Sequence, residues 1–218
     1  KAILKLDKLG IQVGYPDKIP ALYDQFKVDE EESLIANLNQ LTVTANKELF
    51  SRWNKPVDRM RWEMSAATVN AYYHPFKNII VFPAAILQAP FYSLKQSSSQ
   101  NYGGIGAVIA HEISHAFDNN GSLFDEFGNL NNWWTDEDSA HFKQLAQKMI
   151  EEFDGIPFAG QKVNGKLTVS ENIADAGGLS CALEAAKTEA DFNAQEFFIN
   201  WATIWRMKAT EQYMQLLL

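Results

Sequence analysis

The sequence predicts an α+β fold that is mainly helical, with one small sheet, in a single domain. Hydrophobic residues recur at three- and four-residue steps through most of the chain, whereas strand patterns are few. No linker rich in proline and glycine and no internal repeat divides the 218 residues. Hydrophobic residues make up 46% and charged residues 21% of the sequence, a globular composition that excludes intrinsic disorder.

The first predicted elements are a helix and a hairpin. Residues 34–53 carry Leu and Ala on one helical face, and the acidic run at 29–32 suits a helix N-terminus. Residues 68–73 and 78–82 are rich in β-branched and aromatic side chains, so we expect two strands. These strands pair as a hairpin, with His74 exposed and without a function at its tip.

The remaining predicted elements are helices. A short helix over 84–88 follows the hairpin. Residues 105–118 contain no proline and are apolar on nearly every side, so we expect a buried helix that the turn at 119–121 ends. Thr135, with an aspartate three residues on, predicts the start of another helix. Aromatic residues along 197–208 predict a last helix packed in the core.

Charge and cysteine content exclude several classes of protein. Lys and Arg number 19 and Asp and Glu 27, so the net charge of 19 − 27 = −8 excludes nucleic acid as a partner bound through basic charge. The single Cys181 allows no internal disulfide, which favours a reducing compartment, and we expect it to be a small buried side chain. No apolar run approaches the roughly 18 residues of a membrane span.

The segment 111–115 has the sequence His-Glu-Ile-Ser-His, which is the H-E-x-x-H pattern. Residues four apart on a helix differ by about 40° around its axis, so His111 and His115 can face one metal ion with Glu112 beside them. A hydrolytic zinc site uses three protein ligands and one open position, so one ligand is still lacking. The pattern arises by chance in roughly one percent of chains of this length, and the alternative is two core histidines bonded to carbonyls.

The segment 168–175 supplies two further carboxylates. Glu171 and Asp175 lie four residues apart, on one face of a predicted second helix, and can face the histidines together. Thr168 and Glu171 resemble a capping box at the start of that helix. The alternative is that Glu171 only caps a helix at the surface.

His111 to Asp118, followed by Glu171-Asn172-Ile173-Ala174-Asp175, resembles the neprilysin-type zinc metallopeptidases of family M13, among them bacterial enzymes like endopeptidase O. The third ligand lies 171 − 115 = 56 residues after the second histidine. That spacing favours this group over the thermolysin-like enzymes, where it is about twenty residues. The resemblance spans most of 65–205 and includes the segments 69–73, 81–91, 101–106 and 132–135.

The resemblance implies a zincin-like (gluzincin) metallopeptidase catalytic domain with a small edge-strand sheet. It implies one Zn²⁺ per chain, with the ligands His111, His115 and Glu171. Glu112 would be the general base that deprotonates the zinc-bound water. Asp118 and Asp175 match positions that hydrogen-bond the ligating imidazoles; Asp175 is also assigned as a catalytic proton donor in the family, and we give the orienting role greater weight.

The resemblance also implies oligopeptide substrates. Asn70 and Ala71 match an edge strand that binds the substrate backbone. An apolar pocket would take the residue after the scissile bond, so that cleavage falls on the amino side of an apolar residue. Its implied lining is Ile86, Phe91, Tyr92, Val108 and Trp205. The alternative function is a peptide-binding or structural domain that keeps the scaffold without turnover.

Two regions of the family have no counterpart in this sequence. A later segment of about fifty residues, whose histidine and arginine bind the oxyanion, and a large N-terminal helical domain are absent. We therefore expect residues 1–218 to be a single, partial catalytic domain that is weakly active or inactive alone, with the remainder of a longer chain as its partner. The favoured location is the bacterial cytoplasm, and the alternative is an extracytoplasmic or secreted one.

Overall fold

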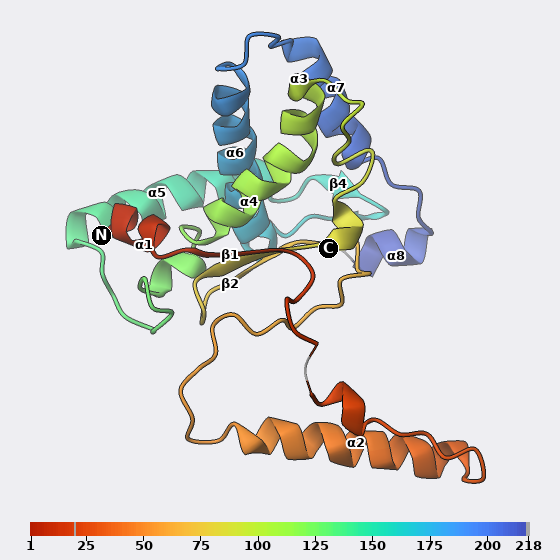
Figure 1. The fold of residues 1–218 in the computed structure, drawn as a ribbon. Helices are drawn as coiled ribbons and strands as arrows, with labels where there is room; N and C mark the ends of the chain where they lie inside the picture. Colours follow the sequence, from red (N-terminus) through yellow and green to blue (C-terminus); the bar gives the residue numbers. More distant parts are fainter. Residues whose placement is uncertain (20, 217–218) are drawn as a thin grey trace.

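A three-stranded sheet lies against a group of helices in the computed structural model, which describes residues 1–19 and 21–216 (Figure 1). The strands are β1 (Gly10–Gly14), β2 (Tyr72–His74) and β3 (Ile79–Pro83), in the order β1-β3-β2. β1 runs parallel to β3 and β2 runs antiparallel to it, so that Ile11 and Tyr73 both lie opposite Ile80. β3 is buried along its whole length, and β2 forms one edge of the sheet.

Helices make up most of the rest, which confirms the prediction of a mainly helical α+β fold. α4 and α6 pack side by side above the sheet, and α3 packs against α7 (Figure 1). The helices are α1 (Ala2–Asp7), α2 (Leu34–Ser51), α3 (Ser98–Asn101), α4 (Ala107–His115), α5 (Asp136–Phe153), α6 (Gly165–Ala186), α7 (Ala194–Ile204) and α8 (Glu211–Leu216). A separate small hairpin joins β4 (Pro157–Phe158) to β5 (Gln161–Lys162).

α4 is buried on two sides. One face packs on the sheet through Val108, in a cluster with Ile80, Phe82 and Ile86. The opposite face packs on α6, where Ala174 and other small residues are buried. These two contacts explain why the sequence of α4 is apolar nearly all round.

The backbone of α6 approaches α4 very closely at Gly178. A Cβ atom built on Gly178 would lie 2.6 Å from the backbone nitrogen of His111 and 2.7 Å from its Cα. Real side chains do not approach backbone atoms so closely, so only glycine fits there. The separation of the two helices is therefore set by a residue with no side chain.

α4 is shorter than predicted at both ends. A π-helical turn, Tyr102–Gly106, precedes it, and Gly104 breaks the helix with φ −93° and ψ −107°. After His115 the amide of Ala116 bonds back only three residues, to Ile113, so the last turn tightens and the helix ends before Asp118. The helix that begins after Thr135 is confirmed: the Thr135 hydroxyl accepts a hydrogen bond from the amide of Asp138 at 3.1 Å.

Several predicted boundaries are wrong. The predicted strand 68–73 begins only at Tyr72, and the predicted helix 84–88 is a single 3₁₀ turn, Ala84–Ile86. α7 ends at Ile204 instead of 208. β1 has no counterpart in the prediction because its five residues include two glycines and carry little strand pattern.

Three surface features also differ from the predictions. α2 forms as predicted after Ser33, yet its apolar residues Leu34, Leu38 and Leu49 are exposed, and the helix lies apart from the other helices (Figure 1). Cys181 is exposed rather than buried. His74 is neither exposed nor without contacts, because its Nε2 lies 3.1 Å from the Glu63 carboxylate. Among the described residues, the longest helices are too polar to cross a membrane.

We predict that Gly178→Ala destabilises the protein although alanine is the better helix former. Helix propensity favours alanine by about 1 kcal/mol, but overpacking a core contact costs typically about 1–3 kcal/mol, so the clash dominates. Denaturant unfolding measures the difference. Gly177→Ala is the matched control, because its Cβ would meet no backbone atom and only the Ser114 side chain, with Oγ 2.7 Å and Cβ 3.2 Å away. Equal stability of the two variants would contradict the prediction.

Candidate metal centre

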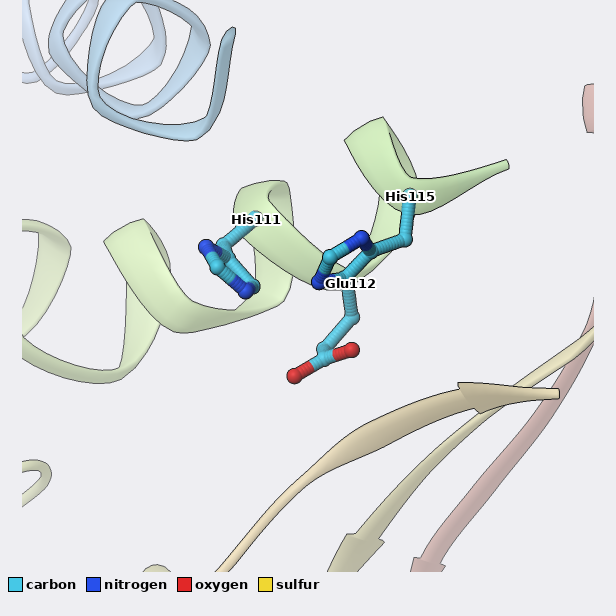
Figure 2. Close-up of side chains that lie close together, drawn as sticks. All are labelled: His111, Glu112 and His115. Carbon is cyan, nitrogen blue, oxygen red and sulfur yellow. The ribbon is translucent and has the colours of Figure 1, made fainter. Parts of the chain in front are cut away.

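Two imidazoles face the same space on α4. His111 and His115 lie one turn apart, and their ring centroids are 4.5 Å apart with the ring planes at 89°. Figure 2 shows both rings beside Glu112, whose carboxylate extends from the helix toward the sheet. The four-residue spacing on a regular helix produces this convergence, as the sequence predicts.

Glu171 brings a carboxylate oxygen to both imidazoles from α6. Its Oε2 lies 3.4 Å from Nε2 of His111 and 3.5 Å from Nε2 of His115. Tetrahedral ligands about 2.0–2.1 Å from a zinc ion are separated by about 3.3–3.4 Å. The two distances from Glu171 Oε2 to the imidazole nitrogens therefore match the separation of neighbouring ligands in a zinc tetrahedron.

Glu112 is a second acidic group near the same atoms. His111, Glu112 and His115 each offer a ligand atom within 4.8 Å of the other two. The spacing supports Glu171 as the third ligand, because its oxygen lies 3.4 and 3.5 Å from the two nitrogens. Glu112 is 6% exposed, and burial raises the pKa of its carboxyl, although the two neighbouring histidines act in the opposite direction.

Each imidazole also has a carboxylate partner at its other nitrogen. Nδ1 of His111 lies 2.8 Å from Oδ1 of Asp175, and Nδ1 of His115 lies 2.7 Å from Oδ2 of Asp118. A proton on Nδ1 leaves the Nε2 lone pair available, which is the tautomer that a metal ligand needs. The structure thus places Asp118 and Asp175 beside the two imidazoles, where the resemblance to the family implied them.

Asp118 is held much more firmly than Asp175. Asp118 is 2% exposed, and its Oδ1 accepts hydrogen bonds from the amides of Asn120 and Gly121, each at 2.7 Å. Ser170 donates to Oδ2 of Asp118 at 2.6 Å. Burial raises the pKa of Asp118, but the hydrogen bonds with His115, Ser170 and the two amides hold it below its ordinary value. Half of the Asp175 side chain, by contrast, is exposed.

The predicted capping box at the start of α6 is wrong. The helix begins at Gly165, and the Asn164 side chain caps it by accepting from the amide of Leu167 at 3.1 Å. Thr168 and Glu171 therefore lie inside the helix. Asn164 is a preferred N-cap residue, and it competes successfully with the threonine four residues on.

The centre stabilises positive charge. Burial lowers the pKa of His111 and of His115, but the hydrogen bonds that the imidazoles donate to carboxylates outweigh it and raise these values to about 9 and about 10. The same imidazoles hold the pKa of Glu171 well below its ordinary range. Two imidazole nitrogens and the Glu171 carboxylate form a donor set of borderline-soft and hard ligands that suits Zn²⁺.

A cleft of about 690 Å³ opens beside these residues. Of the predicted substrate residues, those that line it are Asn70, Ala71, Ile86, Phe91, Val108 and Trp205. Tyr92 lies outside the lining, because consecutive residues in this turn point in different directions: Phe91 packs on the core and Tyr92 is exposed. Asn70 and Ala71 precede β2 rather than lying within it, beside the edge of the sheet.

Sequence analysis missed several other residues of the cleft. They are Val69, Tyr72, Tyr73, Pro75, Asn120, Gly121 and Ser170. Ser170 directly precedes Glu171, and its contact with Asp118 crosses 52 residues of sequence, so local pattern gave no signal for it. Pro75 belongs to the hairpin turn, of which the sequence analysis considered only His74.

Comparison with known proteins places this centre in a defined group. Residues 70–218 match the description "Peptidase family M13". A neutral endopeptidase of Lactococcus lactis subsp. cremoris is 54% identical over 218 residues, which are 100% of this chain and 35% of that protein. The crystal structure of PepO from Lactobacillus rhamnosis HN001 superposes with a TM-score of 0.94 at 45% identity, over 100% of this chain and 35% of that one.

A second solved structure has a similar fold. The zinc metalloprotease Zmp1 of Mycobacterium tuberculosis, in complex with an inhibitor, superposes with a TM-score of 0.92 at 38% identity, over 99% of this chain and 35% of that one. The chain thus spans about a third of the length of these relatives, since each is covered to 35%. The zincin-like fold that the motifs implied is confirmed by these superpositions.

We predict that Asp118→Asn and Asp175→Asn each weaken zinc binding by about 10- to 100-fold, the usual effect of removing a carboxylate partner from a ligating histidine. Only Asp118→Asn also lowers the free energy of unfolding, by about 1–3 kcal/mol, because its buried carboxylate has further hydrogen-bond donors. Competition with a chelating dye measures affinity, and urea unfolding of the zinc-free protein measures stability.

The exposed Asp191 is the control carboxylate, and Asp191→Asn leaves both quantities unchanged. Unchanged zinc affinity in both site variants would remove Asp118 and Asp175 from the metal centre. Equal stability losses in the two would show that the buried hydrogen bonds of Asp118 carry no special weight.

Proposed function

Because the chain belongs to peptidase family M13, we propose that it is the zinc-binding part of a metalloendopeptidase that hydrolyses oligopeptides. The observation that supports this most is the placement of Glu171 Oε2 at 3.4 and 3.5 Å from the two Nε2 atoms, with Glu112 left beside them. A site that only binds zinc would not need the carboxylate of Glu112 beside the three ligands, whereas a hydrolytic site needs a base there. The names of the relatives, neutral endopeptidase and zinc metalloprotease, agree with this function.

His111, His115 and Glu171 would hold the zinc ion. When bound in such a three-ligand site, zinc acts as a Lewis acid and lowers the pKa of a coordinated water to about 7. Asp118 and Asp175 keep the protons of the two imidazoles on Nδ1, so that the Nε2 lone pairs stay directed into the site.

Glu112 moves the proton in the proposed reaction. Its carboxylate accepts a proton from the attacking water and delivers it to the leaving amine. Burial strengthens it as a base, because its raised pKa lies nearer to neutral pH than that of an exposed glutamate. Its place on the sheet side of the imidazoles puts it next to the strand edge where a peptide can lie (Figure 2).

The cleft supports an extended peptide as substrate. The edge of the sheet at β2 leads into the cleft through Asn70 and Ala71, whose amide and carbonyl can hydrogen-bond a peptide backbone. Ile86, Phe91 and Val108 provide an apolar wall in the same cleft. We therefore propose cleavage on the amino side of an apolar residue.

Glu112→Gln tests the proton-transfer role. The amide keeps the shape of the side chain but cannot accept the proton, so we predict that kcat falls by about 10²- to 10⁴-fold while zinc content stays at one ion per chain. Peptide hydrolysis in the full-length protein, with metal content measured on the same samples, gives both numbers.

Glu171→Gln is the matched control, since it removes the other central carboxylate and should release zinc. Wild-type turnover in Glu112→Gln would exclude Glu112 as the base. No turnover in the zinc-loaded wild type, with zinc bound as predicted, would instead favour a domain that binds peptides without hydrolysing them.

We predict that zinc stabilises the folded protein in addition to its role in peptide hydrolysis. At a free zinc concentration of 100 times Kd, binding to the native state alone adds about 2.7 kcal/mol to the free energy of unfolding. For a chain of this length this raises the Tm by about 5–10 °C. Differential scanning calorimetry with and without a chelator measures the shift. His115→Ala should abolish it, and an equal shift in that variant would place the stabilising ion elsewhere.

A further inference from the structure

Lys5 is the most buried charged side chain in the described part of the protein outside the metal centre. It belongs to α1 and is 2% exposed. Its Nζ donates to three backbone carbonyls, those of Ala116 at 2.7 Å, Gly121 at 2.8 Å and Phe124 at 2.7 Å. The three protons of the ammonium group are thus matched by three acceptors.

All three acceptors lie in the segment that follows the last residue of α4. We call residues 116–124 the Lys5 loop. It contains no hydrogen-bonded strand, and at Phe124 it only forms an isolated bridge with Leu130. The loop has one 3₁₀ turn, Gly121–Leu123, and a few backbone hydrogen bonds of its own, such as that from the amide of Ser122 to the carbonyl of Asp118. Lys5 adds three hydrogen bonds from outside the loop, and they bind it at Ala116, Gly121 and Phe124.

The surroundings of Lys5 keep it charged at neutral pH. Burial lowers its pKa to about 8, while the nearby carboxylates of Asp118 and Asp125 act in the opposite direction. The rings of Tyr73, Phe117 and Trp133 lie 5.9, 5.6 and 5.9 Å from Nζ, within the range of cation–π attraction. A charged donor of this kind binds carbonyls more strongly than a neutral one.

The Lys5 loop carries Asp118, the hydrogen-bond partner of His115. Gly121 connects the two groups: its carbonyl accepts from Lys5, and its amide donates to Oδ1 of Asp118 at 2.7 Å. The other oxygen of Asp118 contacts Nδ1 of His115 at 2.7 Å. A chain of direct contacts thus runs from α1 to one imidazole of the metal centre.

The other imidazole has its carboxylate partner on a different element, and among the described residues only the Ser170–Asp118 hydrogen bond links that element to the loop. Asp175, the partner of His111, lies on α6, and its contact does not involve the Lys5 loop. A change at Lys5 that acts through the loop should therefore affect His115 and spare His111.

We propose that Lys5 is a positioning residue for His115: it fixes the 116–124 loop so that Asp118 stays aligned with Nδ1 of His115. The inference rests on the proposed metal site for its functional meaning, but the contacts that carry it exist without the metal. It can therefore fail while the proposed function stands, and it can hold if hydrolysis is never observed.

Lys5→Met tests the proposal, because it keeps the length and apolar stem of the side chain and removes all three donors. The readout is the Nδ1–H signal of each imidazole in proton NMR of the zinc-loaded full-length protein, assigned with Asp118→Asn and Asp175→Asn. We expect the His115 signal to shift or disappear and the His111 signal to stay. Lys8→Met, at an exposed lysine that follows α1, is the matched control and changes neither signal.

Zinc affinity is the second readout. Lys5→Met should weaken zinc binding by about 10- to 100-fold, as loss of the Asp118 contact would. Unchanged affinity with both signals in place would overturn the proposal. Equal changes in the two imidazole signals would also overturn it, because they would show a general loosening of the fold.

Lys5→Arg keeps the proposal testable if Lys5→Met does not fold. Arginine retains the charge, but its planar donors cannot point at three carbonyls in the way an ammonium group does. We expect a smaller shift confined to the His115 signal and a smaller loss of zinc affinity. A shift in both signals, or in neither, would contradict the proposed role.

Discussion

The close contact of α4 with α6 is the constraint on which the rest of the centre depends. The two helices can approach because Gly178 has no side chain where it meets the backbone of His111. This approach brings a carboxylate of one helix within 3.4–3.5 Å of two imidazoles of the other. The four-residue spacing places His111 beside His115 on α4 and Glu171 beside Asp175 on α6. The contact between the two helices then sets the distance between the histidines and the carboxylates.

The sheet and the loop after α4 complete what the helix pair begins. One face of α4 packs on the sheet, and Glu112 extends from the helix toward that sheet (Figure 2). The helix ends at His115, and the following loop returns Asp118 to that same histidine. The helix α4 therefore carries the base and two ligands, α6 carries the third ligand, and the segment that leads into β2 carries the substrate edge.

The sequence predicts those parts of the metal centre that depend on the spacing of residues within one helix. The pairs on α4 and α6 follow from helical spacing, and the roles that the resemblance implies for them stay predictions. Ser170 and Lys5 were not predicted, because their partners lie 52 and more than 100 residues away in the sequence. The capping box failed because Asn164 caps α6 earlier, and the partial-domain boundaries and cytoplasmic location stay predictions.

Zinc-edge X-ray absorption of the loaded full-length protein tests the central claim most directly. The account predicts two imidazole nitrogens and carboxylate and water oxygens at about 2.0–2.2 Å, with no sulfur. In Glu171→Gln at saturating zinc, it predicts that both imidazoles stay and the carboxylate contribution is lost. A spectrum with one imidazole, or one that Glu171→Gln leaves unchanged, would contradict the claim that α4 and α6 together build the site.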